Sequence, residues 1–346
     1  MIDNIKIFLS EDILKMNDSE WIALNSNERF ADYRHLNNTL CQSAIHLRID
    51  KQKHIATIRG SLRKWYYGGD SLKDFNKDSF LKAILKLART LRIPPSEIGK
   101  AKFTNCEIGL NLRTKTEPIE IISKIVGYKC LQRNDKYQSV GTLYFGSQNS
   151  SRKLILYDKQ KEIEDKQKQA NQTITLSSPY SKRKDHFTLR IELRLNDHKS
   201  WQELHVGYIE TIGDLWANWS NLYEIWTHEI SDLVVFSGIN KDKCRGKDFL
   251  LAELLENRGL HDALEELCKR SNAKSAKGIK TARHKHKERL LYIIMKYGNR
   301  KVYNNISFRC EITKCLLSRS KSEDIDLLFL YRLLWKPVFL NNKKEK

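Results

Sequence analysis

The sequence lacks the features that mark membrane and secreted proteins. No apolar run approaches the roughly 18 residues that a bilayer-spanning helix needs. Residues Met1 to Ser10 carry Asp3, Asn4 and Lys6, so they do not show the basic-then-apolar layout of a signal peptide. The seven cysteines are scattered and form no CxxC pair, which argues against a disulfide framework and against a structural zinc site. We therefore expect a protein of a reducing cytoplasm with no membrane partner.

Several common catalytic motifs are missing as well. The chain has no P-loop, no glycine-rich dinucleotide loop and no GxSxG motif. The pair of histidines around a hydrophobic residue, which is usual in nicking enzymes, is also absent. His284 and His286 flank a lysine in a basic helical stretch, and this arrangement makes a poor metal site. These absences argue against a P-loop or dinucleotide-binding site and against a GxSxG serine nucleophile. Any chemistry must then come from other residues.

Positive charge is the most prominent property of the composition. The chain contains 62 Lys+Arg against 42 Asp+Glu, a net charge of +20. Residues 238–346 hold 26 basic and 13 acidic side chains, so much of the excess lies in the C-terminal third. A surplus of this size indicates a polyanionic partner, most often nucleic acid. The alternative is a general basic bias of the proteome from which the sequence comes.

The hydrophobic pattern predicts an antiparallel sheet followed by helices. Apolar and polar residues alternate in short segments that we expect to be strands, namely 44–50, 54–67, 102–113, 140–146, 153–157 and 186–196. Helices are expected at 79–93, 118–126 and 162–170, and a polar loop at 171–184. After residue 197 the pattern is helical, at 201–230, 247–270, 276–297 and 322–334.

This order of elements predicts the α+β class, with a central antiparallel sheet, flanking helices and an all-helical basic C-terminal region. We expect two parts, a core at 1–198 and a basic helical part at 199–346.

Two acidic residues lie on the polar faces of predicted strands. Glu107 is one, and Glu192, flanked by Arg190 and Arg194, is the other. Two carboxylates on one face of a sheet could hold a divalent cation through their hard oxygen atoms. The alternative is a solvated face with cross-strand ion pairs, which is common in antiparallel sheets.

A tyrosine at the end of a strand is the candidate nucleophile. Tyr157 is followed by Asp158 and Lys159, just before a predicted helix. A tyrosine can attack a phosphodiester and retain the phosphate as a covalent ester, if a cation holds the phosphate. Lys159 could supply that charge. The alternative is a tyrosine that packs its ring at the strand end and leaves its hydroxyl in water.

The C-terminal part contains one strongly basic helical stretch. Its cationic side chains fall within about four turns, and they are Lys277, Lys280, Arg283, Lys285, Lys287 and Arg289. Such a helix can lie along phosphates or enter a groove of DNA. The alternative is a solvated charged face, but acidic partners are nearly missing from this stretch. We therefore expect it to bind DNA.

Several segments together resemble one known family. They are RGSLRKWYYGG at 59–69, NCEIGLN at 105–111, GTLYFGS at 141–147, YDKQKE at 157–162 and LRIELR at 189–194. In this order they are similar to the motifs of the filamentous phage gene II/X replication proteins. The YFGS and YDK pair is also similar to that of the trans-acting initiators of rolling-circle plasmids. The resemblance covers roughly residues 44–196.

The resemblance implies an endonuclease that starts rolling-circle replication. Such a protein nicks one DNA strand at an origin, forms a 5′-phosphotyrosine, leaves a 3′-hydroxyl for the host polymerase and later rejoins the ends. The expected cofactor is Mg²⁺ or Mn²⁺. The expected partners are origin DNA, single-stranded or supercoiled, and the helicase and polymerase of a bacterial host cell. The alternatives are a non-catalytic DNA-binding regulator of replication or transcription, and a relaxase of a mobile element.

The resemblance also implies roles for individual residues. Tyr157 matches the tyrosine of the YDK motif and is the expected nucleophile, with Tyr144 of the neighbouring motif as second choice. Glu107 and Glu192 match the strand acids and are the expected metal ligands. Lys159 would polarise the phosphate or lower the pKa of the tyrosine. The two strand arginines would orient a metal ligand or bind backbone phosphate, and they are Arg190 and Arg194.

Overall fold

The structure is a computed structural model of the chain. It describes residues 1–15, 20–36, 44–129, 133–134, 141–147, 149–169, 186–235, 238–271, 275–297 and 316. The predicted loop at 171–184 and the predicted helix at 322–334 lie outside these residues.

One large antiparallel sheet forms the centre of the described structure. It has ten strands in the order β2-β3-β4-β5-β1-β6-β11-β10-β9-β8. The strands are β1 Ile2–Ser10, β2 Ile22–Ser26, β3 Phe30–Leu36, β4 Ala44–Asp50, β5 Ile55–Ser61, β6 Lys102–Thr114, β8 Arg133–Asn134, β9 Thr142–Phe145, β10 Arg152–Asp158 and β11 Phe187–Leu195. Two short strands, β7 Ile125–Tyr128 and β12 Leu233–Val235, make a separate pair. The predicted α+β class is confirmed, and β12 is a strand in a region predicted to be helical throughout.

Two long central strands, β6 and β11, alternate apolar and polar residues regularly. On β11, the residues Leu189, Ile191, Leu193 and Leu195 are fully buried, and on β6 the same holds for Ile108, Leu110 and Leu112. These side chains point to one face of the sheet because successive residues of a strand alternate between the two faces. The opposite face therefore receives the polar residues of both strands.

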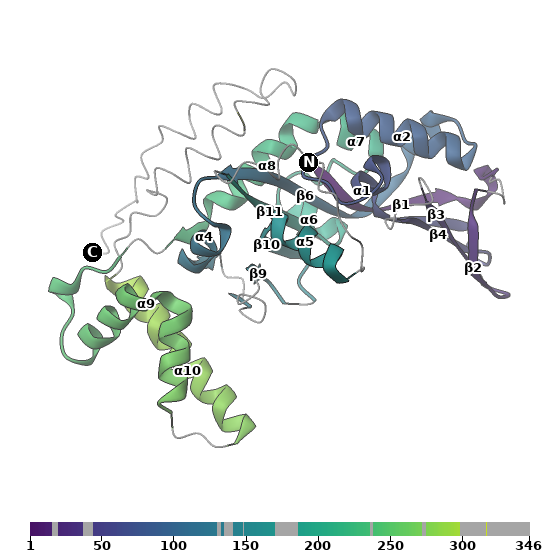
Figure 1. Cartoon of the computed structure of the whole chain (residues 1–346). Coiled ribbons are helices and arrows are strands. Elements are labelled where there is room, and N and C mark those ends of the chain that lie inside the picture. The colour runs from purple at the N-terminus through teal and green to yellow at the C-terminus, as the bar shows by residue number, and fades with distance from the viewer. Residues whose placement is uncertain are drawn as a thin grey trace, which may run out of the picture.

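Helices cover the apolar face (Figure 1). Among them, α2 Lys77–Leu91 and α8 Trp219–Ser231 meet through the rings of Phe80 and Trp219, 5.0 Å apart between centroids. Trp226 of α8 donates a hydrogen bond to the Ile191 carbonyl on β11 (3.1 Å). This part of the chain also contains α1 Leu62–Tyr67, α3 Pro95–Lys100, α4 Pro118–Lys124, α5 Lys159–Gln169, α6 His198–Glu203 and α7 Ile212–Ala217, with a 3-10 turn at Glu11–Ile13. Of these, α5 begins on the polar side, where Lys159 lies beside Tyr157.

The prediction of a strand over 54–67 is wrong in its second half. The strand ends at Ser61, whose side chain accepts a hydrogen bond from the backbone N–H of Lys64 (3.1 Å) and so caps a helix. Gly68, with a φ of 80°, ends that helix in the left-handed conformation. Residues 62–67 are therefore α1.

The N-terminal strand was not predicted, yet it is central. β1 lies between β5 and β6, and its Ile5, Ile7 and Leu9 are buried. Asp3 and Phe8 break the simple alternation of apolar and polar residues, which concealed the strand in the sequence.

A second, separate hydrophobic cluster forms around the C-terminal helices. It joins a 3-10 turn at Lys241–Lys243, α9 Lys247–Lys269 and α10 Ala276–Tyr297 through residues such as Leu255, Leu264 and Ile293. In Figure 1 this pair of helices extends away from the sheet. Helices α6 to α8, in contrast, contribute Trp201, Trp219 and Trp226 to the sheet core. We therefore propose that the two parts of the chain divide near residue 238 rather than at 198.

Candidate active site

Three neighbouring strands bring the predicted polar residues to one face of the sheet. In the register of the strands, Glu107 of β6 lies opposite Arg194 of β11, and Glu192 lies opposite Gly109. On the other side of β11, Arg190 lies opposite Tyr157 of β10. The structure thus brings together acids, arginines and tyrosine that are up to 87 residues apart, from 107 to 194.

Gly109 makes room for this arrangement. A Cβ atom at this position would lie 2.9 Å from Nη2 of Arg190 and 3.0 Å from Cγ of Glu192. Any larger residue would displace the two side chains from their present positions.

The third acid, Asp3, was missed by sequence reasoning. Between the pairs Ile2–Ile108 and Ile5–Cys106 the register of β1 and β6 shifts, so Asp3 and Asn4 together face Glu107. A bulge of this kind re-aims a side chain toward a site. The signal in the sequence was an acid inside an apolar N-terminal segment, but the alternation gave no reason to place it on this face.

The three carboxylates form a compact buried cluster. Asp3, Glu107 and Glu192 each offer an oxygen atom, and these atoms lie within 4.8 Å of one another. All three residues are at least nine-tenths buried. Such hard oxygen ligands are those that Mg²⁺ and Mn²⁺ prefer.

Arginines hold these acids in place. Nε of Arg190 lies 2.6 Å from Oε1 of Glu192, and Nη2 lies 3.1 Å from Oδ2 of Asp3. Arg194 bridges Glu107 (2.7 Å) and Glu192 (3.2 Å). Arg63 of α1 makes a second ion pair with Asp3 (2.8 Å).

The electrostatics of the cluster differ from acid to acid. Burial, together with the negative charge of Glu192, raises the pKa of Glu107 to about 7. The pKa of Glu192 is instead lowered, since the attraction of Arg190 and Arg194 outweighs the cost of its burial. Arg194, which Glu107 shares with Glu192, offsets only part of the cost of burial and repulsion at Glu107. A divalent cation bound here would supply further positive charge. On this observation the donor set fits a metal ion.

Tyr157 is joined to the acid cluster by a direct hydrogen bond. Its hydroxyl donates to Oε1 of Glu192 at 2.9 Å. Burial and the charge of Glu192 raise the pKa of Tyr157 well above its usual value, while Arg190 acts to lower it. The tyrosine is therefore protonated at rest, and its proton points at the carboxylate.

The other two predicted catalytic residues lie nearby. Lys159 is fully buried, and its Nζ is 5.5 Å from the centroid of the Tyr157 ring and is ion-paired with Glu162. Burial lowers the pKa of Lys159. Tyr144 of β9 is half-buried and lies opposite Ile155 of β10, one strand further from the acids than Tyr157.

Arg190 is buried at the centre of the site. Besides Glu192 and Asp3, its guanidinium binds Asp74 (2.9 Å) and Asn111 (3.1 Å). These contacts fit the predicted role of orienting a metal ligand better than direct binding of phosphate.

Removal of Arg190 should strongly destabilise the fold. In Arg190→Met three buried carboxylates lose their shared cation, and we expect the free energy of unfolding to fall by about 3–5 kcal/mol. The matched control is Arg48→Met, which breaks an exposed pair with Asp32 (2.7 Å) and should cost about 1 kcal/mol or less. Urea denaturation followed by tryptophan fluorescence measures both. Equal losses in the two variants would contradict this interpretation of the site.

Comparison with known proteins assigns the part of the chain that contains this sheet to a family. Residues 1–212 match the family model that describes the N-terminal part of the phage replication-associated protein of the gene II type. The chain belongs to this family. The match contains every strand of the ten-stranded sheet and all residues of the site, so the resemblance seen in the sequence is confirmed.

Two further comparisons, with curated proteins and with solved structures, add less information about the chain. No curated protein matches the chain. Among solved structures, the chain is similar to a rolling circle replication initiator protein from Geobacillus stearothermophilus. The two share 13% identity and a TM-score of 0.40, and the similarity covers 70% of this chain and 88% of that chain. No helix in the described part of the chain is long and apolar enough to cross a membrane.

The basic helix lies outside the part that matches the family. It is α10, and of its predicted DNA-binding residues Lys277, Lys280, Lys285 and Arg289 are exposed. Arg283 is half-buried and ion-paired with Glu265 of α9 (2.6 Å). Lys287 is half-buried. The structure thus brings four of the six cations to the surface of α10, far along the chain from the acid cluster.

Proposed function

We propose that this replication-associated protein is a metal-dependent endonuclease that nicks one strand of origin DNA to initiate rolling-circle replication. One observation carries the proposal, namely the hydrogen bond from the Tyr157 hydroxyl to Glu192, which belongs to a buried cluster of three carboxylates. A regulator without catalysis would have no need for a nucleophile beside a cation site. The convergence of these residues therefore supports the nickase over the non-catalytic DNA-binding alternative.

In the proposed reaction the Tyr157 oxygen attacks phosphorus and the bond from phosphorus to the 3′ oxygen breaks. The 3′ oxygen leaves with the electron pair and takes up a proton, and the 5′ phosphate stays on the tyrosine as an ester. The tyrosine proton passes along its hydrogen bond to Glu192, which releases it to water, and water in turn protonates the leaving 3′ oxygen. Because one phosphodiester replaces another, the reverse reaction can rejoin the ends.

The acids Asp3, Glu107 and Glu192 would hold a Mg²⁺ or Mn²⁺ ion, which supplies positive charge to the phosphate oxygens. Arg190 and Arg194 keep Glu192 ionised and oriented. Lys159, beside the tyrosine ring, adds a further positive charge near the nucleophile. The exposed cations of α10 would bind the origin DNA, and the released 3′-hydroxyl would serve the polymerase of the host.

The test is a covalent adduct with a defined polarity. Full-length protein is incubated with a random-sequence single-stranded DNA library and Mn²⁺, and the products are separated in SDS. A 3′-end label should move with the protein and a 5′-end label should not, because the tyrosine keeps the 5′ phosphate of the downstream fragment. Chelation of the metal should abolish the adduct, and sequencing of the adducts gives the nick site. Salt-sensitive DNA binding with no adduct under any condition would favour the non-catalytic regulator.

A further inference from the structure

The outer half of the polar face carries a row of basic residues that the proposed chemistry does not use. Four strands contribute one residue each, and the register places them directly opposite one another. Lys6 of β1 faces Arg59 of β5, which faces His46 of β4, which in turn faces Arg34 of β3. Arg34 and Arg59 are exposed, and the other two are half-buried.

This row is electrostatically unfavourable without a partner. Like charges directly opposite one another on neighbouring strands, as Lys6 and Arg59 are, destabilise a sheet. Among the described residues, no ion pair involves any of the four, and the acid of the next row, Asp32, is already paired with Arg48 (2.7 Å). Burial, together with the charges of Arg59 and Arg34, lowers the pKa of His46, so at neutral pH the charged members of the row are Lys6, Arg59 and Arg34.

The position of the row connects it to the site. Lys6 lies two residues after Asn4, whose side-chain amide donates to Glu107 (2.6 Å), so the row starts beside the carboxylate cluster. From there it runs across the sheet to β3, away from β10 and β11.

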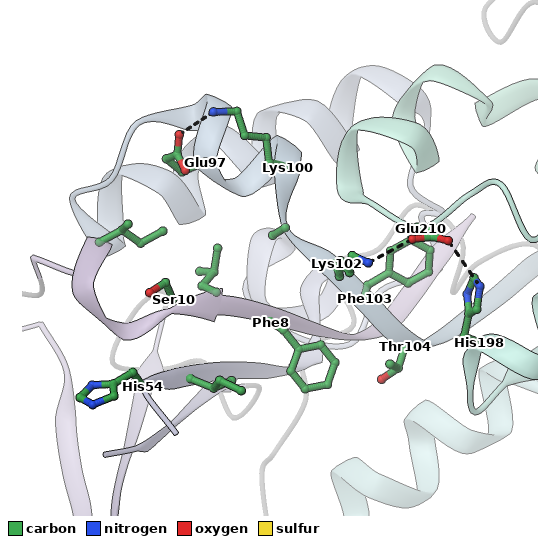
Figure 2. Close-up of a pocket in the computed structure, with 14 residues that line it drawn as sticks. Phe8, Ser10, His54, Glu97, Lys100, Lys102, Phe103, Thr104, His198 and Glu210 are labelled. Carbon is green, nitrogen blue, oxygen red and sulfur yellow. Dashed lines mark hydrogen bonds and ion pairs between the residues drawn. The ribbon is translucent and has the colours of Figure 1, made fainter. Parts of the chain in front are cut away.

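An aromatic ring lies beside the start of the row. Phe8 is half-buried, and Nζ of Lys6 is 5.0 Å from its ring centroid. Phe8 lines a pocket of about 780 Å³ together with residues such as Thr104 and His198. Figure 2 shows Phe8 and Thr104 projecting to the same side of their strands.

We propose that this surface, the row of Lys6, Arg59, His46 and Arg34 with Phe8 at its inner end, binds the single-stranded DNA that flanks the scissile phosphate. The proposal deepens the proposed function and rests on it for the nature of the scissile bond. The charged members Lys6, Arg59 and Arg34 would bind phosphates, and the Phe8 ring would stack on a base near the point where the strand enters the site.

The surface fits a single strand better than a duplex. Single-stranded DNA is typically held by a positively charged track combined with aromatic rings on which unpaired bases stack. The bases of a duplex are already stacked on each other and offer no face to Phe8. An open sheet face also lacks the protruding helix or ribbon that reads the major groove.

The test measures the salt dependence of binding to a fluorescein-labelled 30-nucleotide oligo-dT by anisotropy. The variant is Arg34→Gln/Arg59→Gln, which removes the two exposed members of the row. Each phosphate contact to a single strand contributes about 0.7 to the slope of log K against log salt, so the slope should fall by roughly 1.4 and the affinity at 0.1 M salt by roughly 10- to 30-fold. The thermal midpoint should not fall, because like-charge repulsion is relieved.

The matched control is Lys82→Gln/Arg89→Gln, which removes two exposed cations of α2, on the opposite face of the sheet. Its affinity should stay within about twofold of the wild type, because cations on the far face touch no phosphate of the bound strand. Equal losses in the two variants, or no loss in either, would overturn the proposal.

The adduct assay separates this proposal from the proposed function. Wild-type protein that forms the adduct, with a row variant that binds like the control, would refute the binding surface and keep the nickase. If the salt slope of DNA binding falls in Arg34→Gln/Arg59→Gln but the wild type never forms the adduct, the binding surface stands and the nickase is refuted.

Discussion

Tyr157→Phe should abolish the covalent protein–DNA adduct, with a loss of roughly a thousandfold or more. Phenylalanine keeps the ring that packs beside Lys159 but removes the oxygen that we propose attacks phosphorus. Glu192 loses one hydrogen bond and keeps its contacts with Arg190 (2.6 Å) and Arg194 (3.2 Å), so the fold should survive. The measurement is the adduct yield in SDS with the 3′-labelled DNA, at saturating Mn²⁺.

Tyr144→Phe is the matched control for this experiment. It removes the same atom from a tyrosine on the same face, one strand further from the acids. We expect its adduct yield to stay within about threefold of the wild type, because its hydroxyl is not the one bonded to Glu192. Loss of the adduct in Tyr144→Phe and not in Tyr157→Phe would keep the endonuclease and transfer the role of nucleophile. Oligo-dT binding by both variants shows that a lost adduct is not lost affinity.

The parts of this site that could be predicted from the sequence are those set by local alternation. Glu107 and Glu192 lie on strands whose apolar residues repeat every second position, so their placement on the polar face follows from the pattern. The position of Tyr157 at a strand end follows for the same reason. That these three side chains meet depends on β6, β11 and β10 being neighbours, which the motif resemblance implied and the alternation alone did not.

The parts that could not be predicted depend on contacts distant in sequence or on a break in the pattern. Asp3 reaches the cluster only through the bulge between β1 and β6, more than one hundred residues apart in the chain. Residues 62–67 include aromatic side chains that favour a strand. The N-cap at Ser61 and the left-handed Gly68 instead stabilise a helix there. The burial of Arg190 also follows from partners on other elements, Asp3 and Asp74 among them. The alternation of a strand predicts which residues lie on its polar face. It does not predict whether other elements will bury that face.

Glu107→Gln should make the metal-free protein more stable at pH 8 and leave its stability unchanged at low pH. The pKa of Glu107 is raised from 4.5 to about 7 in the folded protein. The folded state therefore binds more protons than the unfolded state between these values, and the contribution of Glu107 to stability is lost as the pH rises through about 7. At pH 8 the wild type should be less stable than the variant by about 3 kcal/mol, and at pH 4 the two should agree.

Urea denaturation at a series of pH values measures this difference. Tryptophan fluorescence reports on unfolding of the part that contains Glu107, because four tryptophans are buried in the core of the sheet. They are Trp65, Trp201, Trp219 and Trp226. A constant difference between the two proteins from pH 4 to pH 8 would show that the substitution acts through packing and not through ionisation of Glu107.

Mn²⁺ should reverse the order of stability at pH 8, so that the wild type becomes more stable than Glu107→Gln. At pH 8 the wild type has Glu107 ionised and ready to bind a cation, so Mn²⁺ should stabilise it and raise its urea midpoint. At pH 5.5 the proton on Glu107 competes with the metal, and the stabilisation should be much smaller. Glu107→Gln should respond weakly to Mn²⁺ at either pH, because one of the three carboxylates is gone. A wild type that Mn²⁺ stabilises equally at both pH values would mean that the cation binds elsewhere, and that the raised pKa of Glu107 belongs to a buried acid with no role in metal binding.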